Sequence, residues 1–222
     1  MKNKFISILA VFSLVGFAAD NEIYVDQSGT GANIDLEQLG ISNIIGGLSS
    51  AAGDLTAFDL DGNAMTLDIN MIGATNKFLG DIYADNFTGL YNFTGGTNSF
   101  TIQVDPTNSN SSDGSNQNVA VTGSGNTFTL NQGTSAIAAS LDLDWIIQGS
   151  NNTVTSNINT GTGVNASAGG YFYLDHTGGS RTFNIQQLST QDNDWLKITS
   201  ISGTAASTVC VVQNDQGTST SC

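Results

Sequence analysis

Apolar and polar side chains alternate on both sides of a recurring glycine. In the clearest copy, residues 119–130, bulky apolar residues occupy every second position before Gly123 and again after Asn126. Alternation with a period of two is typical of a β-strand with one buried face. Glycine adopts positive φ without steric cost and asparagine tolerates it, so the Gly-x-x-Asn segment predicts a turn between two strands.

The same unit recurs along the chain. Seven glycines follow one another at steps of 33, 22, 28, 26, 29 and 25 residues, which indicates a loosely periodic repeat array. Five units carry the asparagine, whereas the last two carry Arg181 and Ala206 in its place. The predicted turn residues are Gly40, Asn43, Gly73, Asn76, Gly95, Asn98, Gly123, Asn126, Gly149, Asn152, Gly178 and Gly203.

The repeat also predicts the fold class. Each unit reads as a β-hairpin of about twelve residues, and an isolated hairpin is only marginally stable in water. Stacking successive units would bury their apolar rows in one shared core. The abundant Gly, Asn, Thr and Ser disfavour helices. We therefore predict an all-β protein in which stacked β-hairpins form a β-solenoid, with an antiparallel β-sandwich as the alternative.

The N-terminus differs from the rest of the chain. Lys2 and Lys4 precede an apolar run, residues 5–17, that is followed by two alanines. Residues 1–19 are therefore predicted to be a signal peptide or hydrophobic leader, with a retained anchor as the alternative. We expect an N-terminal section at 20–50, a β-hairpin repeat array at 51–213 and a polar C-terminal tail at 214–222.

Charge and cysteines narrow the choice of partners and compartment. Without residues 1–19, the basic residues Lys77, Arg181 and Lys197 stand against 19 acidic ones, which leaves a net charge of −16. Phosphate backbones and anionic membranes would be repelled, so we expect no nucleic-acid partner and no membrane partner after leader removal. Export would expose Cys210 and Cys222 to oxidising conditions, which predicts a disulfide between them.

Few residues suggest chemistry. The single histidine, His176, follows Asp175 on a predicted strand, and no nucleophile or oxyanion hole accompanies it, so we predict no enzymatic activity and no cofactor. Asp59, Asp61 and Asn63 place oxygen ligands at alternate positions and are a weak calcium candidate. The same Asp-Gly-Asn stretch is also an ordinary turn, which we favour.

Aromatic residues lie in or near several predicted strands. Alternation places Trp145 in the core and leaves Trp195, Tyr171 and Tyr173 open between core and an exposed binding face. A sugar or another partner could stack on such a face, so these residues matter for the choice between a passive scaffold and a binding protein.

The sequence carries two resemblances to known proteins. The segment Gln38-Leu39-Gly40-Ile41-Ser42-Asn43 resembles the Gln-x-Gly-x-x-Asn signature of curlin-type repeats, over roughly residues 23–45. That resemblance implies an exported bacterial subunit that forms β-solenoid surface fibres. Met71, Phe93, Val121 and Ile147 replace the glutamine in later units. The whole chain is similar to proteins of marine contractile-tailed cyanophages at 21–47, 170–197 and 210–222, which implies a virion-associated or host-surface role.

Together these patterns predict a non-enzymatic structural or adhesive β-repeat protein. It would be secreted, displayed on an extracellular surface or attached to a virion. Its partners would be further copies of itself, in a homo-oligomer or fibre, or other surface or virion proteins. The alternative is a glycan-binding or polysaccharide-degrading surface protein built on the same scaffold.

Overall fold

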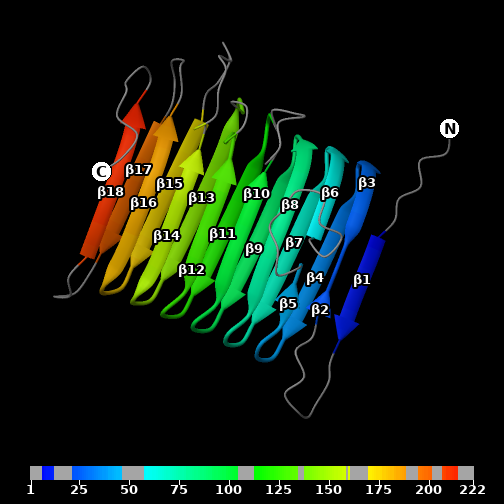
Figure 1. Ribbon diagram of the computed structural model, residues 1–222, viewed down its shortest axis with the longest axis horizontal. Helices are drawn as coiled ribbons and strands as arrows, with labels where there is room; N and C mark the ends of the chain where they lie inside the picture. The colour runs from blue at the N-terminus through cyan, green and yellow to red at the C-terminus, as the bar shows by residue number, and fades with distance from the viewer. Residues whose placement is uncertain are drawn as a thin grey trace.

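The structure, a computed structural model, consists of β-strands stacked in two layers (Figure 1). It describes residues 7–12, 22–46, 58–104, 113–134, 138–158, 160, 170–188, 195–201 and 207–214. Every regular element in these ranges is a strand, which confirms the all-β prediction. The described part of the chain holds no helix that is long and apolar enough to cross a membrane.

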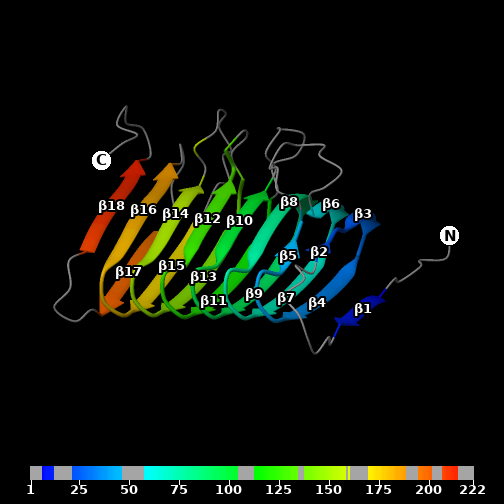
Figure 2. The same ribbon diagram turned by 60° about the horizontal axis from the view of Figure 1, so that its bottom comes forward.

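The strands form two sheets that face each other across one core (Figure 2). Sheet A has the strand order β1 (Ser7–Phe12), β4 (Asn33–Leu39), β7 (Thr66–Ile72), β9 (Thr88–Thr94), β11 (Asn116–Thr122), β13 (Leu141–Gln148), β15 (Gly170–Thr177) and β17 (Trp195–Ile201). Sheet B has the order β18 (Ser207–Asn214), β16 (Arg181–Leu188), β14 (Asn152–Ile158), β12 (Thr127–Gln132), β10 (Ser99–Val104), β8 (Lys77–Asp85), β5 (Ile44–Ile45) and β2 (Glu22–Ile23), while β3 (Asp26–Thr30) pairs with β6 (Phe58–Asn63), which also pairs with β8.

All strand pairings between described residues are parallel. The chain runs along sheet A, turns at a Gly-x-x-Asn corner and returns along sheet B, so each unit adds one strand to each sheet (Figure 1). The β-solenoid prediction is confirmed, and the antiparallel sandwich is excluded. The two strands of a unit pair with neighbouring units rather than with each other, so the unit is a strand–turn–strand arch and not a hydrogen-bonded hairpin.

The apolar rows of the repeat meet between the sheets. Rings contact one another along the whole stack: the centroids of Phe93 and Phe100 lie 3.5 Å apart, and Trp145 lies 4.6 Å from Phe128 and 4.8 Å from Phe172. Trp145 is completely buried, as predicted. Burying one such side chain stabilises the fold by about 1.5–3 kcal/mol, so the stacked rows supply most of the driving force for winding.

One described strand, β1, lies within the predicted N-terminal leader. Ser7–Phe12, inside the predicted leader, form β1 and pair with β4 at the edge of sheet A. Removal of residues 1–19 stays a prediction, and it would make β4 the edge strand. Beyond the leader, β4 pairs with β7, so the predicted section 20–50 and the array 51–213 share the same sheets.

The register corrects the last repeat unit. Val209, and not Thr208, lies beside the core residue Phe183 in sheet B. In sheet A, Ser200 lies beside His176, so Ile201 points outward and is 63% exposed. The predicted corner residue Gly203 lies outside the described residues. The Gly-x-x-Asn spacing, applied to the last unit, predicts Ile201 and Thr208 in the core row; that prediction is wrong by one residue because this unit does not keep the spacing.

Candidate functional site

The inner edge of each corner is a column of glycines. Gly73, Gly95, Gly123, Gly149 and Gly178 all have positive φ, between 125° and 148°. A Cβ built on any of the five would come within 1.9 Å or less of the carbonyl oxygen of the glycine in the preceding unit. Only glycine therefore allows successive corners to stack at the spacing of paired strands, which is the physical reason for the repeat.

Buried asparagines form a second column beside the glycines. The backbone N–H of Asn43, Asn76, Asn98 and Asn126 each donates to the side-chain Oδ1 of the asparagine one unit further on, over 2.8–3.0 Å. The Nδ2 groups of Asn98, Asn126 and Asn152 donate back to the carbonyl oxygens of Gly73, Gly95 and Gly123. These bonds satisfy backbone groups that the corner would otherwise leave buried without partners.

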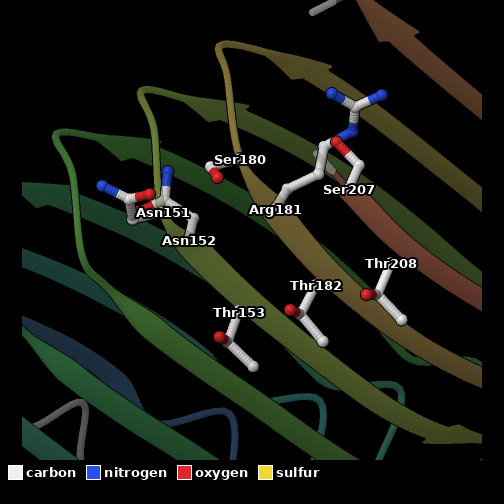
Figure 3. Close-up of a pocket in the computed structure, with 8 residues that line it drawn as sticks. All are labelled: Asn151, Asn152, Thr153, Ser180, Arg181, Thr182, Ser207 and Thr208. Carbon is white, nitrogen blue, oxygen red and sulfur yellow. The ribbon is translucent and has the colours of Figure 1, made fainter. Parts of the chain in front are cut away.

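The asparagine column ends at Arg181, beside a hollow of about 290 Å³ (Figure 3). Arg181 Nη1 donates to the carbonyl oxygen of Gly178 over 3.5 Å, and the guanidinium carbon lies 5.9 Å from the Phe183 ring centroid. The hollow is lined by Asn151, Asn152, Thr153, Ser180, Arg181, Thr182, Ser207 and Thr208. Hydroxyl, amide and guanidinium groups dominate this lining, so it suits water or a polar ligand.

The outer face of sheet B carries threonines in two adjacent rows. Register alignment puts Ser99, Thr127, Thr153, Thr182 and Thr208 in the first row, and Thr101, Thr129 and Thr155 in the second. Asn184 and Cys210 continue the second row. Ser99 and the seven threonines of the two rows, without Asn184 and Cys210, are here called the threonine face. All eight are exposed or half-buried. Figure 3 shows the hydroxyls of Thr153, Thr182 and Thr208 pointing the same way.

The outer face of sheet A is less regular and partly acidic. It holds a groove of about 360 Å³ that is lined by Asp68, Leu90, Tyr91, Asn92, Asn118, Val119, Ala120, Asp144 and Ile146. Partial burial, followed by repulsion from Asp35, raises the pKa of Asp68 above its usual value. Carboxylate and amide groups around an apolar floor could hydrogen-bond a polar molecule.

Exposed aromatics lie further along sheet A, outside that groove. The ring centroids of Tyr171 and Trp195 are 6.1 Å apart, and the two side chains are 58% and 43% exposed. The Nζ of Lys197 lies 5.3 Å from the Tyr173 ring centroid. The structure thus places Tyr171 and Trp195, which alternation left open, on the outer surface.

The histidine is part of the core. His176 is completely buried and packs edge-on against Phe183, with ring centroids 5.2 Å apart. Asp175 is its neighbour on a strand and so points to the opposite face of sheet A. Burial first, and then the Arg181 guanidinium, lowers the pKa of His176. The two residues are therefore not arranged as a catalytic pair.

The predicted calcium ligands lie on a strand rather than in a loop. Asp59, Asp61 and Asn63 all belong to β6, and the turn follows at Ala64, which has φ of 54°. The prediction of an Asp-Gly-Asn turn is therefore wrong. No group of three or more His, Cys, Asp or Glu side chains gathers at one point among the described residues. Calcium binding stays a prediction.

The C-terminal end of the solenoid exposes its core row. Val209 and Val211 lie in register with the fully buried Phe183 and Ile185, yet are 51% and 40% exposed because β18 is the last strand of sheet B. Cys210 lies between them on β18. Cys222 lies outside the described residues, so the disulfide stays a prediction.

The fold defines a class of protein: a two-sheet parallel β-solenoid with glycine and asparagine corners. The chain matches no protein-family model, no curated protein and no solved structure. Function must therefore be inferred from the ends and outer faces of the solenoid.

Proposed function

We propose that this chain is a non-enzymatic structural protein that is exported and assembles end to end with further copies of itself. The observation that carries the proposal is the exposed core row at the C-terminal end. Solenoids that stay monomeric need terminal repeats with a polar outer face. Val209 and Val211 instead leave apolar surface on β18, which is the outermost strand of sheet B among the described residues.

A second copy is the partner that fits this end. The edge of β18 offers a parallel strand, and the opposite end of the same solenoid begins with parallel strands of similar spacing. Docking a second copy would continue both the backbone pairing and the apolar row. Leader removal would support this assembly, because it leaves β4 without its partner β1.

The test compares two aspartate variants on the same strand. Val209→Asp puts a charge into the exposed core row, whereas Thr208→Asp puts the same charge on the outer face one residue away. Light scattering and negative-stain electron microscopy over a range of protein concentrations should show oligomers or fibres for the parent and for Thr208→Asp, but monomers for Val209→Asp. The proposal is contradicted if the parent stays monomeric at every concentration, or if both variants lose assembly to the same extent.

Export is tested separately. Mass spectrometry of the protein recovered from the secreting cell should find a mature N-terminus close to residue 20. An intact Met1 on the recovered protein would remove export from the proposal and leave assembly untouched.

The exposed aromatic pair favours a second candidate function, glycan binding. Tyr171 and Trp195 offer ring faces on which a sugar can stack, and Lys197 adds a cation beside Tyr173. Titration with a panel of soluble polysaccharides should then change the fluorescence of Trp195, while the buried Trp145 contributes a constant background. No binding by the parent, or unchanged binding by Trp195→Ala in calorimetric titration, would exclude glycan binding at this pair.

A further inference from the structure

The threonine face has a repeat in two directions. Strands β10, β12 and β14 each contribute a hydroxyl residue, an inward residue and a threonine, and the register sets these pairs side by side. Strands in a sheet lie about 4.8 Å apart, and residues two apart on a strand are separated by about 6.7 Å. Hydroxyl and methyl groups therefore repeat at about these distances over the face.

Ice has nearly the same repeat. Its water molecules are joined tetrahedrally by O–H···O hydrogen bonds of about 2.75 Å, and tetrahedral geometry then spaces equivalent oxygens by about 4.5 Å within a layer and about 7.3 Å perpendicular to it, a repeat that spans two layers. Both spacings agree with those of the face to within about a tenth. From Ser99 to Thr182 the accumulated mismatch is about 0.9 Å, well below half a lattice spacing.

The face is also uncharged and stiff. Strands β10, β12 and β14 contain no ionisable residue, although the chain carries a net charge of −14. The adjoining outward row, Gln103, Asn131, Asn157 and Gln186, is neutral too, and Asn157 donates to Asn131 over 2.8 Å. Threonine is β-branched and has few accessible rotamers, so the hydroxyls hold their positions. This neutrality matches an uncharged partner such as water.

Strand propensity alone does not explain the pattern. The outer face of sheet A is built on the same kind of backbone and has one row rich in threonine, which includes Thr94, Thr122 and Thr177. The row beside it holds Asn92, Ala120, Ile146 and Asp175, with no repeated residue. A paired, in-register array of hydroxyls thus occurs on sheet B and not in this part of sheet A.

We propose that the threonine face binds the surface of ice. The hydroxyls would occupy oxygen positions of the lattice, and the methyl groups between them would hold water in the intervening hollows. This activity is separate from end-to-end assembly, because the face lies on the side of the solenoid and the docking strands lie at its ends (Figure 2).

The test uses one substitution on two faces. Thr129→Tyr places a bulky ring at the centre of the threonine face, and Thr122→Tyr makes the same change on the outer face of sheet A. Tyrosine favours strands, so both variants should fold. Ice recrystallisation inhibition and incorporation into slowly growing ice are measured for the parent and both variants, with circular dichroism as the fold check.

The parent and Thr122→Tyr should enter the ice and inhibit recrystallisation, while Thr129→Tyr should need about tenfold more protein for the same inhibition. If Thr129→Tyr does not fold, the near-isosteric Thr129→Val, which replaces the hydroxyl with a methyl group, takes its place. Exclusion of the parent from ice, or equal activity of the two tyrosine variants, would overturn the proposal. Repeating the ice assays on Val209→Asp separates ice binding from end-to-end assembly, since that variant should still bind ice as a monomer.

Discussion

Two glycines of one corner make the stacking of the solenoid directly testable. Gly123 and Gly125 both have positive φ, 140° and 75°. A Cβ on Gly123 would lie 1.8 Å from the carbonyl oxygen of Gly95, whereas a Cβ on Gly125 would have its nearest neighbour at 3.9 Å. We therefore expect Gly123→Ala to destabilise the protein far more than Gly125→Ala.

The size of the difference follows from the geometry. A side chain at the left-handed φ of Gly125 costs about 1–2 kcal/mol, and a side chain at the larger φ of Gly123 costs at least as much. Thr75 and Thr97, which have φ of 58° and 61°, occupy the position equivalent to Gly125, so the backbone there accepts a side chain. Real Cβ contacts are almost never shorter than 3.0 Å, so Gly123→Ala must push the neighbouring corner away by at least 1.2 Å.

That displacement would break hydrogen bonds between corners. Two bonds join the corners at Gly95 and Gly123: the N–H of Gly95 donates to the carbonyl oxygen of Thr122 over 2.8 Å, and the buried N–H of Asn98 donates to Oδ1 of Asn126 over 3.0 Å. Losing both adds about 2–4 kcal/mol, because buried groups would lose their partners. Gly123→Ala should therefore cost about 3–6 kcal/mol in total and Gly125→Ala about 1–2 kcal/mol.

Thermal unfolding followed by circular dichroism measures the difference. At about 3 °C per kcal/mol for a chain of this length, the midpoint should fall by roughly 9–18 °C for Gly123→Ala and roughly 3–6 °C for Gly125→Ala. Equal shifts in the two variants would show that positive φ alone explains the glycine column, and would refute the close approach of successive corners.

Three further variants probe the same column and the core. Asn126→Ala removes two buried hydrogen bonds and should lower the free energy of unfolding in urea by about 2–4 kcal/mol. The control Asn92→Ala, at an exposed position, should lower it by only about 0.5 kcal/mol. Similar losses in the two variants would contradict a structural role for the asparagine column. Arg181→Asn should lengthen the column by one unit and raise stability by about 1 kcal/mol, and a lower urea midpoint would count against it. The pKa of His176 is lowered in the folded state, so the unfolded chain binds the proton more readily and the free energy of unfolding should fall as pH drops from about 7 to 5. His176→Gln should flatten that decline. An unchanged pH profile in the variant would assign the decline to other groups.

Much of the core could be predicted because the repeat fixes which positions face inward. Alternation placed Trp145 inside, and the Gly-x-x-Asn spacing located five of the corners by both residues. The loose period also has a structural explanation. The connections from sheet B to sheet A vary in length, from two residues between β8 and β9 to eleven between β10 and β11, while the corners from β4 to β16 span only three or four residues between the strands.

The pairing of the strands could not be predicted from the same pattern. Alternation is identical whether two strands pair with each other or with the next unit, since it reports only which face is buried. The choice is made by the corner, where two residues at positive φ turn the backbone so that the strands face each other through their side chains. The threonine rows were equally visible as Thr-x-Thr in the sequence, but their alignment depends on that parallel register.

The corners fix the register, so the side chains at outward positions can vary without changing the fold. Their identity can therefore be determined by what the surface binds. Inward rows must fill the core, and corner glycines and asparagines must stack, so neither can report on a partner. The outer face of sheet A carries an irregular mixture of acidic, amide and aromatic side chains. Sheet B instead repeats one residue type in two neighbouring rows. Two sheets with the same backbone and different outward patterns imply different contacts, and a repeating surface is most useful against a partner that itself repeats.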